Sequence, residues 1–289
     1  MPFTSFEFVA KAGQDGLSVR DFLRRECGIT ARSMTLLKYY GSITRDKTPL
    51  KAHNIVHAGD RITLNLPPEQ NDIAPVEGVL DILYEDDYLL IVNKPASMPV
   101  HPTKLHQADT LANIVANYQR QRGESYTFRA LNRLDKDTSG CVVVAKDRLT
   151  YALVRETVRK TYAAVCEGIV DREGTISAPI GLADNSRIKR AVRQDGAEAV
   201  THYRPIRYGN GHTLLKLTLE TGRTHQIRCH MSYIGHPLAG DDLYGGSLEH
   251  IGRQALHCRD VSLLHPFSKQ TIDIRTDIPE EFLTIIKEG

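Results

Sequence analysis

The sequence predicts an α+β fold, in which a mixed, largely antiparallel sheet with flanking helices follows a small N-terminal α/β unit. Two patterns support this prediction. Strand-like segments with alternating or continuous apolar residues follow one another through the second half of the chain, and most connections between them are short enough for hairpins. Helical spacing of apolar residues is confined to a few segments. The expected strands of this half are 161–170, 200–207, 213–219, 255–264 and 271–275.

The N-terminal segment is expected to contain two helices followed by strands. Ser18 begins a capping-box pattern, and Thr30 can cap a second helix that Gly41 ends. Strands follow near Ile43 and over 61–66. This helix-helix-strand order resembles the small RNA-binding module of ribosomal protein S-four, and the resemblance implies an RNA-binding domain at the front of the chain.

A polar stretch with several prolines separates this unit from the rest of the chain. Residues 67–75 show no hydrophobic periodicity, which is typical of a linker. We therefore expect a small RNA-binding domain at 1–68, a linker at 69–78 and a larger domain at 79–289. The larger domain is expected to begin with strands at 79–84 and 88–93 and to contain helices at 110–121 (capped by Asp109), 147–159 and after Arg223.

Charge is distributed unevenly along the chain. The whole sequence has 37 Lys and Arg against 35 Asp and Glu, a net charge of +2, so no global basic excess indicates nucleic acid. Through Pro68, however, ten basic and six acidic residues leave 10 − 6 = +4, and the remainder carries 27 − 29 = −2. A basic front segment joined to a near-neutral body is typical of a binding module attached to a catalytic one.

Several protein classes are disfavoured by what the sequence lacks. The five cysteines are widely spaced without a Cys-x-x-Cys pair, and His225 and His230 do not have the spacing of a zinc helix, so neither a disulfide framework nor a metal site is expected. No apolar run approaches the ~20 residues that cross a bilayer, and the N-terminus has no secretory pattern. We therefore expect a cytoplasmic protein that is not bound to a membrane and, by default, a monomer.

The loop around Asp135 is the strongest candidate for chemistry. The segment Leu131-Asn132-Arg133-Leu134-Asp135-Lys136-Asp137-Thr138-Ser139-Gly140 places a carboxylate between basic residues, directly before the apolar run 141–145. Catalytic groups are commonly placed on loops that a rigid strand supports. Taken alone, the loop has a simpler interpretation as a solvated turn with an exposed ion pair.

Two further blocks follow in order and change this interpretation. They are Arg159-Lys160-Thr161-Tyr162-Ala163-Ala164-Val165 and Thr221-Gly222-Arg223-Thr224-His225-Gln226-Ile227-Arg228-Cys229-His230. Together with the Asp135 loop they resemble the RluA/RluD family of RNA pseudouridine synthases, and the resemblance runs from about Leu80 to the C-terminus. It implies an enzyme that isomerises specific uridines of structured RNA, ribosomal or transfer RNA, without a cofactor.

The resemblance assigns roles to individual residues. Asp135 would be the catalytic aspartate, and Arg223 would pair with it and keep it ionised. Tyr162 would stack on the target uracil, although without its flanking motif it would be interpreted as strand packing. Arg133 would fill the gap that a flipped-out uridine leaves in the stack.

Other polar residues are weaker candidates for contact with RNA. Asn132 stands where the commoner family pattern has histidine, so contacts to the RNA backbone are expected to differ there. Lys94 and Arg228 are candidate neighbours of phosphate or of the aspartate. Arg187 and Arg190 belong to a basic cluster that is interpreted either as a solvated loop or as a contact to the RNA backbone.

Two other functions stay open on the residues alone. One is a catalytically silent RNA-binding relative, which would have lost Asp135, Tyr162 or Arg223, and all three are present. The other is a carboxylate-dependent hydrolase of a nucleoside or sugar, for which no second acid at a known spacing is evident. Isomerisation to pseudouridine is redox-neutral, and the chain contains no phosphate-binding glycine loop, so no nucleotide cofactor is expected.

Overall fold

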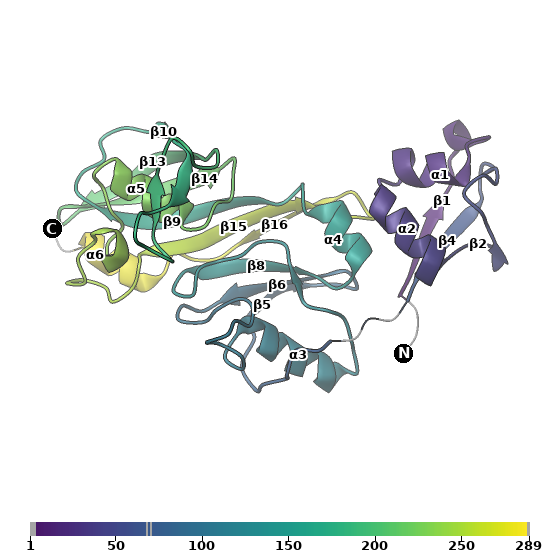
Figure 1. Cartoon of the computed structure of the whole chain (residues 1–289), viewed down its shortest axis with the longest axis horizontal. Helices are drawn as coiled ribbons and strands as arrows, with labels where there is room; N and C mark the ends of the chain where they lie inside the picture. Colours follow the sequence, from purple (N-terminus) through teal and green to yellow (C-terminus); the bar gives the residue numbers. More distant parts are fainter. Residues whose placement is uncertain (1–3, 68, 70, 288–289) are drawn as a thin grey trace.

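The described part of the chain folds around two large sheets and carries a third, two-stranded one. A computed structural model of the protein describes residues 4–67, 69 and 71–287, with a four-stranded sheet near the N-terminus and a ten-stranded sheet in the body. Figure 1 shows them as neighbouring lobes, with α4 lying between the N-terminal lobe and the body. The division of the chain at residue 68 stays a prediction, because residue 68 itself lies outside the described residues.

The N-terminal lobe is built from short elements around the sheet β1-β4-β2-β3. Its second helix begins as expected, because the Thr30 hydroxyl accepts the N–H of Ser33 at 3.1 Å. The first strand was not expected, although Phe6 and Phe8 alternate with polar residues. The elements are β1 (Thr4–Val9), η1 (Ala12–Gln14), α1 (Val19–Asp21), η2 (Phe22–Glu26), α2 (Ala31–Tyr40), β2 (Ser42–Arg45), β3 (Thr48–Pro49) and β4 (Arg61–Leu66).

The body is organised by one long sheet of order β10-β13-β14-β9-β15-β8-β6-β5, with β16 paired to β15 and β7 to β8. Its pairs are antiparallel except β15 with β8, which is parallel. The predicted mixed, largely antiparallel sheet is therefore confirmed. The strands are β5 (Ile82–Glu85), β6 (Leu89–Lys94), β7 (Arg129–Ala130), β8 (Ser139–Ala145), β9 (Arg159–Glu167), β10 (Gly174–Ser177), β13 (Val200–Gly209), β14 (His212–Leu219), β15 (Leu256–Leu264) and β16 (Thr271–Arg275).

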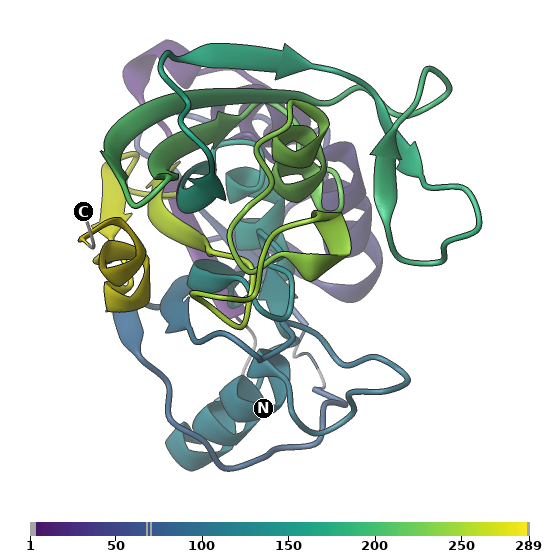
Figure 2. The ribbon, with the colours of Figure 1, turned by 90° about the vertical axis from the view of Figure 1, so that its left-hand side faces the viewer.

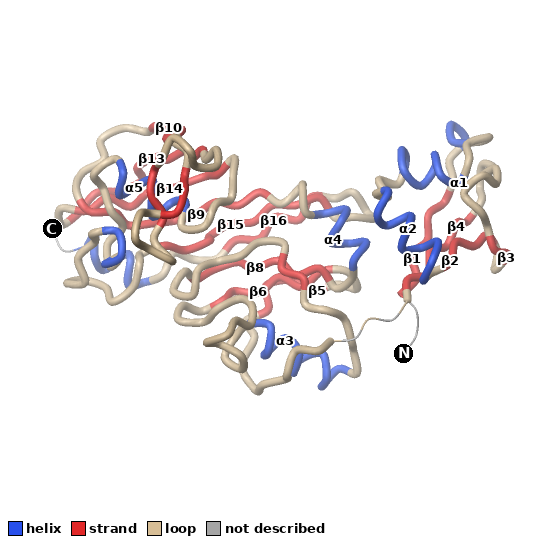
Figure 3. Tube along the Cα trace, in the orientation of Figure 1, coloured by secondary structure: helices blue, strands red, loops and turns tan. Residues whose placement is uncertain are grey.

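Helices flank this sheet (Figure 3). They are α3 (Leu111–Arg122), α4 (Arg148–Val154), α5 (Gln226–Tyr233), η3 (Asp242–Tyr244) and α6 (Glu280–Lys287). A separate hairpin of β11 (Ile180–Leu182) and β12 (Arg190–Val192) projects from the body as the green arm at the right of Figure 2. Within the described ranges, no helix combines the length and the apolar character needed to span a membrane.

Two helix predictions need correction. The cap of α3 is Thr110, whose hydroxyl accepts the N–H of Asn113, rather than Asp109, which instead pairs with His106. The helix expected over 147–159 ends at Val154, because the chain must turn before it enters β9 between β14 and β15.

Aromatic residues join the N-terminal lobe to the body. Phe6 of β1 lies 5.2 Å from the ring centroid of Phe267 and 5.9 Å from that of Tyr88. Leu149 and Leu153 of α4 pack into the same apolar cluster as the N-terminal core. Burial of apolar area across this junction holds the two lobes in one arrangement.

Gly140 allows the closest approach within the body sheet. It has a φ of +111°, and a Cβ at this position would lie 2.2 Å from the carbonyl oxygen of Cys258 in the neighbouring strand. Any other residue would force β8 and β15 apart and would occupy a strained backbone region. The glycine therefore fixes how the Asp135 loop enters β8.

We expect Gly140→Ala to lower the free energy of unfolding by about 2 kcal/mol or more, because both the backbone contact and the positive φ oppose a side chain. Urea denaturation measures this change. Gly252→Ala is the matched control, since a Cβ there meets no atom within 4 Å and the backbone is not in the positive-φ region. Equal stability of the two variants would contradict this account of the junction.

Candidate active site

A cleft in the body brings together the three sequence blocks singled out above. Asp135 and Arg133 come from the loop before β8, Tyr162 from β9, and Arg223 and Arg228 from the segment that leads into α5 and from α5 itself. The residues that line the cleft are Arg133, Leu134, Asp135, Thr138, Tyr162, Leu219, Arg223, His225, Gln226, Ile227, Arg228 and Leu256. Charged groups and apolar walls therefore meet at one place on the sheet.

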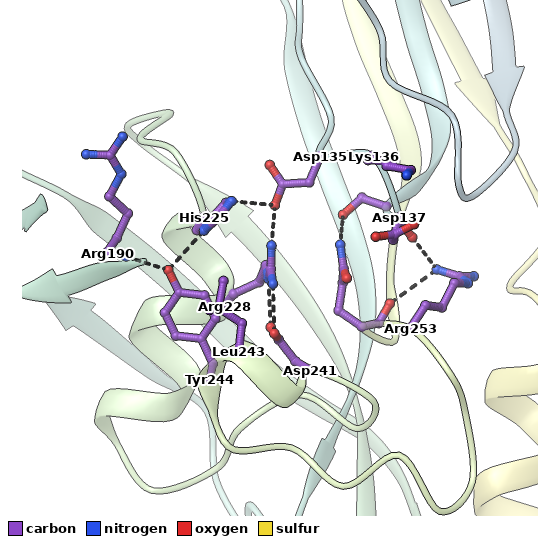
Figure 4. Close-up of polar contacts among 12 residues, drawn as sticks. Asp135, Lys136, Asp137, Arg190, His225, Arg228, Asp241, Leu243, Tyr244 and Arg253 are labelled. Atoms are coloured by element: carbon purple, nitrogen blue, oxygen red, sulfur yellow. Dashed lines mark hydrogen bonds and ion pairs between the residues drawn. The ribbon is translucent and has the colours of Figure 1, made fainter. Parts of the chain in front are cut away.

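Arg228 connects Asp135 to a second carboxylate. Its Nη1 donates to Asp135 Oδ2 at 3.1 Å, while Nε and Nη2 donate to the two oxygens of Asp241 at 2.7 and 2.8 Å. The side chain of Asp241 is 0% exposed and that of Asp135 is 27% exposed. Figure 4 shows the guanidinium between the two carboxylates, with the second oxygen of Asp135 pointing away from it.

The electrostatics of the linked side chains Asp241, Arg228 and Asp135 favour a permanently charged arginine. Burial opposes the charge of Arg228, but hydrogen bonds and charges from Asp241 and then Asp135 outweigh it and raise the pKa of the guanidinium above its usual range. Three N–H groups of one planar fork serve two acceptors at once, which a lysine ammonium on a flexible stem does not reproduce. Arg228 therefore fixes the orientation of Asp135.

The expected pairing of Arg223 with Asp135 is not what the structure shows. Arg223 lines the same cleft, but its Nε donates to the backbone carbonyl of Glu198 at 2.8 Å. It precedes α5, whereas Arg228 lies within the helix and faces the loop. The physical reason is the local backbone, because His225 between them has a φ of +55° and turns the chain before the helix begins.

His225 faces Asp135 from the other side. Its Nε2 lies 3.8 Å from Asp135 Oδ2, and its Nδ1 lies 3.0 Å from the hydroxyl of Tyr244. That hydroxyl accepts the backbone N–H of Arg190 at 2.8 Å, so its own hydrogen is available for Nδ1 (Figure 4). Burial lowers the pKa of His225, although the charge of Asp135 opposes this. The arrangement favours a neutral imidazole with its Nε2 hydrogen toward the aspartate.

Tyr162 forms part of the cleft wall. Tyr162 is 7% exposed and lies on β9 beside Leu217 of β14 and Cys258 of β15. Burial, and then the charges of its neighbours, including Asp135, raise the pKa of the phenol well above its usual value. The phenol hydroxyl therefore stays protonated, and the ring presents an aromatic surface at the cleft.

Buried polar groups anchor the Asp135 loop to the body. Lys94 is fully buried, and its Nζ donates to the carbonyl oxygens of Pro95, Met98 and Lys136 at 2.8, 2.7 and 3.0 Å. Burial lowers the pKa of Lys94 to about 7. Arg253 donates to the carbonyl oxygen of Asp137 at 2.9 Å (Figure 4). Lys94 therefore holds the loop beside Asp135, and its full burial places it away from the surface on which an RNA phosphate would lie.

Asn132 also has a structural position rather than a surface one. It is 6% exposed, its amide donates to the carbonyl of Cys141 at 2.9 Å, and its oxygen accepts the N–H of Val143 at 2.9 Å. These two bonds clamp the loop to β8, so the expected contact to RNA is not supported.

Arg133 is exposed at the mouth of the cleft, and Arg187 lies on the β11–β12 arm.

Comparison with known proteins identifies the family. The sequence pattern of the family described as RNA pseudouridylate synthase matches residues 88–233. The Bacillus subtilis (strain 168) protein named uncharacterized RNA pseudouridine synthase YjbO is 38% identical over 273 residues, which cover 91% of this chain and 96% of that protein. Ribosomal large subunit pseudouridine synthase D of Pseudomonas aeruginosa is 38% identical over 266 residues, covering 85% and 83%.

The chain belongs to the RNA pseudouridylate synthase family. Solved structures agree, since human RNA pseudouridylate synthase domain containing 1 matches with a TM-score of 0.56 at 25% identity, over 69% of this chain and 83% of that one. The predicted family is therefore confirmed, and the protein is an isomerase that acts on RNA. Within the part of the chain that the structure describes, no group of three or more His, Cys, Asp or Glu side chains is placed to hold a metal ion.

Some residues of this synthase site were not anticipated. Asp241 and Tyr244 lie in the segment Gly240-Asp241-Asp242-Leu243-Tyr244-Gly245-Gly246, whose paired acids between glycines were the available signal. For His225 the sequence offers only its spacing from His230, which argues against a metal site and indicates no contact with Tyr244. Their partnership with Arg228 depends on a contact between α5 and the following loop, which sequence spacing does not record.

Acid is expected to destabilise the synthase through His257, which supports the Asp135 loop from β15. Its Nδ1 and Nε2 lie 2.8 and 2.7 Å from the hydroxyls of Ser139 and Thr276, and burial lowers its pKa from 6.5 to about 4. Between these two pH values the unfolded chain binds the proton first. The stability that neutral His257 contributes to the folded state is therefore present above pH 6.5 and is lost as the pH falls toward 4.

Urea denaturation across this pH range should show a smaller loss of stability in His257→Gln than in the wild type, because the variant lacks the imidazole. Each pH unit between the pKa values of the unfolded and folded states contributes up to about 1.4 kcal/mol to this difference. His53→Gln is the control, because His53 is exposed. If both variants follow the wild-type pH profile, the buried histidine is not the acid-sensitive group.

Proposed function

We propose that this synthase converts specific uridines of ribosomal or transfer RNA to pseudouridine, with Asp135 as the catalytic residue. The observation that carries the proposal is the carboxylate of Asp135, held by Arg228 at 3.1 Å in a cleft that Tyr162 also lines. The name of the Pseudomonas aeruginosa relative refers to the large ribosomal subunit, which favours ribosomal RNA as the substrate. Structured RNA is the proposed partner.

The reaction needs a group that tolerates positive charge on the ribose. Cleavage of the bond from the sugar to the uracil nitrogen leaves the bonding electron pair on the base, which then turns and bonds to the sugar through a ring carbon. That carbon loses its proton to restore the ring and the freed nitrogen gains one, so atoms and electrons balance. Asp135 Oδ2 is engaged by Arg228, while the second oxygen points away from the guanidinium. That oxygen is the one we assign to the sugar, as nucleophile or as base.

Electrostatics in the cleft suit this role. Asp135 and Asp241 share the guanidinium of Arg228, so these three groups carry one formal negative charge, and Arg133 and Arg223 line the same cleft. A neutral His225 adds none. The carboxylate of Asp135, already oriented by Arg228, stabilises a developing cationic sugar at short range without reorganisation at the moment of reaction.

Tyr162 and Arg133 receive roles that follow from their positions. A protonated, buried phenol ring supplies a surface on which a uracil can stack, a contact worth about 1 to 3 kcal/mol. Arg133 is exposed at the same cleft, where its guanidinium can replace a uridine that has left the RNA stack. Arg187 and Arg190, both on the β11–β12 arm, are assigned to the RNA backbone.

Asp135→Asn should abolish pseudouridine formation, because an amide carries no negative charge for the ribose. The measurement is position-resolved pseudouridine mapping in cellular RNA incubated with each protein. Asp137→Asn is the matched control from the same loop, and it should keep activity within about threefold of the wild type, an effect below 1 kcal/mol. Full activity of Asp135→Asn would end the assignment, and release of free uracil would indicate hydrolysis instead.

The two arginines of the cleft can be separated by substitution with lysine. Arg228→Lys should lower kcat by about tenfold or more, because one ammonium does not serve both carboxylates. Arg223→Lys should leave kcat nearly unchanged and raise KM, since Arg223 lines the cleft without contacting Asp135. Single-turnover kinetics, measured on an RNA that the wild type modifies, distinguish these effects. A larger kcat loss in Arg223→Lys than in Arg228→Lys would reverse the two roles.

A further inference from the structure

His225 carries a hydrogen-bond donor in the catalytic cleft that the protein itself does not use. Its Nδ1 is engaged by the hydroxyl of Tyr244 at 3.0 Å, whereas its Nε2 lies 3.8 Å from Asp135 Oδ2, beyond hydrogen-bonding distance. Nε2 forms no hydrogen bond with any residue that the structure describes. The side chain is 11% exposed and lines the cleft beside Asp135. Its free nitrogen is therefore available to a substrate.

The hydrogen bonds of Tyr244 decide which nitrogen of His225 carries the hydrogen. The Tyr244 hydroxyl accepts the backbone N–H of Arg190 at 2.8 Å and so turns its own hydrogen toward Nδ1 (Figure 4). Nδ1 therefore accepts a hydrogen bond, and the hydrogen of a neutral imidazole then resides on Nε2. A contact that begins in β12 thus aims a donor at the side of the cleft where Asp135 lies.

A neutral donor suits this position better than a charged one. Burial is the main cause that lowers the pKa of His225, although the charge of Asp135 opposes it. An imidazolium would pair with Asp135 and cancel the negative charge that the ribose needs. A neutral imidazole leaves the carboxylate ionised and still offers a polarised N–H, the way a neutral histidine polarises a substrate carbonyl in other enzymes.

Neighbouring donors in the cleft are already engaged within the protein. Arg228 directs three N–H groups at Asp135 and Asp241. The side-chain amide of Gln226 donates into β13. His225 differs from both, because its Nε2 faces the cleft without an acceptor in reach.

We propose that His225 is a further catalytic residue, whose Nε2–H donates to the 2-carbonyl oxygen of the target uracil as the bond to the sugar breaks. This rests on the proposed function, because Nε2 lies beside the base only if Asp135 faces the sugar. The electron pair of the broken bond stays on uracil and spreads from the nitrogen onto both carbonyl oxygens, of which the 2-carbonyl oxygen is adjacent to that nitrogen. The hydrogen remains on Nε2, so the balance of atoms and electrons given above is unchanged. A donor that is fixed in advance stabilises this charge without reorganisation.

The test removes the contact from each side in turn. The probe is a synthetic RNA stem-loop that contains a uridine mapped as a product of the wild type, prepared with uridine or with 2-thiouridine at that position. Sulfur accepts hydrogen bonds weakly. On the protein side, His225→Asn tolerates the left-handed backbone at this position (φ +55°), but its amide reaches only as far as Nδ1. His225→Gln places an amide N–H at the distance of Nε2.

Single-turnover rates should follow the presence of the donor. On uridine RNA, His225→Asn should lower the rate by about a hundredfold, as for loss of one donor to a developing oxyanion. His225→Gln should recover about tenfold of this loss, because its amide also donates. Tyr244→Phe keeps the ring but frees Nδ1, and it should lower the rate by about tenfold.

The sulfur substitution distinguishes direct contact with uracil from an effect through Asp135. The ratio of the uridine rate to the 2-thiouridine rate should be at least about fivefold larger in the wild type than in His225→Asn, because partners in contact are not additive. The intrinsic effect of sulfur on cleavage is common to both proteins and cancels in this comparison.

Matched controls come from positions outside the cleft. His202→Asn and Tyr233→Phe change the same residue types, and the side chain of His202 is 40% exposed while Tyr233 is 62% exposed. Both should react within about twofold of the wild type, as expected for surface changes. Thermal unfolding of all the variants checks that the fold is unchanged.

The outcomes separate this inference from the proposed function. Equal rate ratios in the wild type and His225→Asn would mean that His225 does not contact the 2-carbonyl oxygen, which overturns the inference whatever the loss of rate. A His225→Asn rate close to that of the controls would overturn it too, while pseudouridine made by the wild type would leave the proposed function standing. If the wild type forms no pseudouridine in cellular RNA, the proposed function fails and this inference fails with it.

Discussion

A buried guanidinium shared by two carboxylates organises the whole site. Asp241 is fully buried and takes two of the N–H groups of Arg228, which leaves Nη1 for Asp135. Removing charges from water is expensive, so each member of such a chain is stable only with its partners in place. The position of Asp135 therefore depends on the contact between α5 and the loop that carries Asp241, two segments distant from it in sequence.

The support of the Asp135 loop follows the same principle. Lys94 buries an ammonium to bind three carbonyl oxygens, and Asn132 uses both ends of its amide on β8. Backbone carbonyls in a bend have no partner in a sheet ladder, and unsatisfied buried groups are costly. Side chains that sequence alone suggests for RNA contact thus complete the hydrogen bonding of the loop instead.

Sequence predicted the parts of this protein that local patterns encode. Apolar alternation located β13, β14, β15 and β16, and the ordered motifs placed Asp135 and Tyr162 in one cleft. Contacts between distant segments were less accessible. Arg223 and Arg228 both lie within the same motif, and the left-handed backbone of His225 and the location of Asp241 decide which arginine meets the aspartate.

The placement of the N-terminal lobe adds a constraint that neither lobe contains alone. Its excess of positive charge, +4 through Pro68, lies in a segment whose α2 faces α4 of the body. Electrostatic attraction to phosphate is not sequence-specific, so charge by itself gives affinity without choosing a uridine. The aromatic contacts of Phe6, Tyr88 and Phe267 hold α2 of this lobe against α4 of the body in one arrangement.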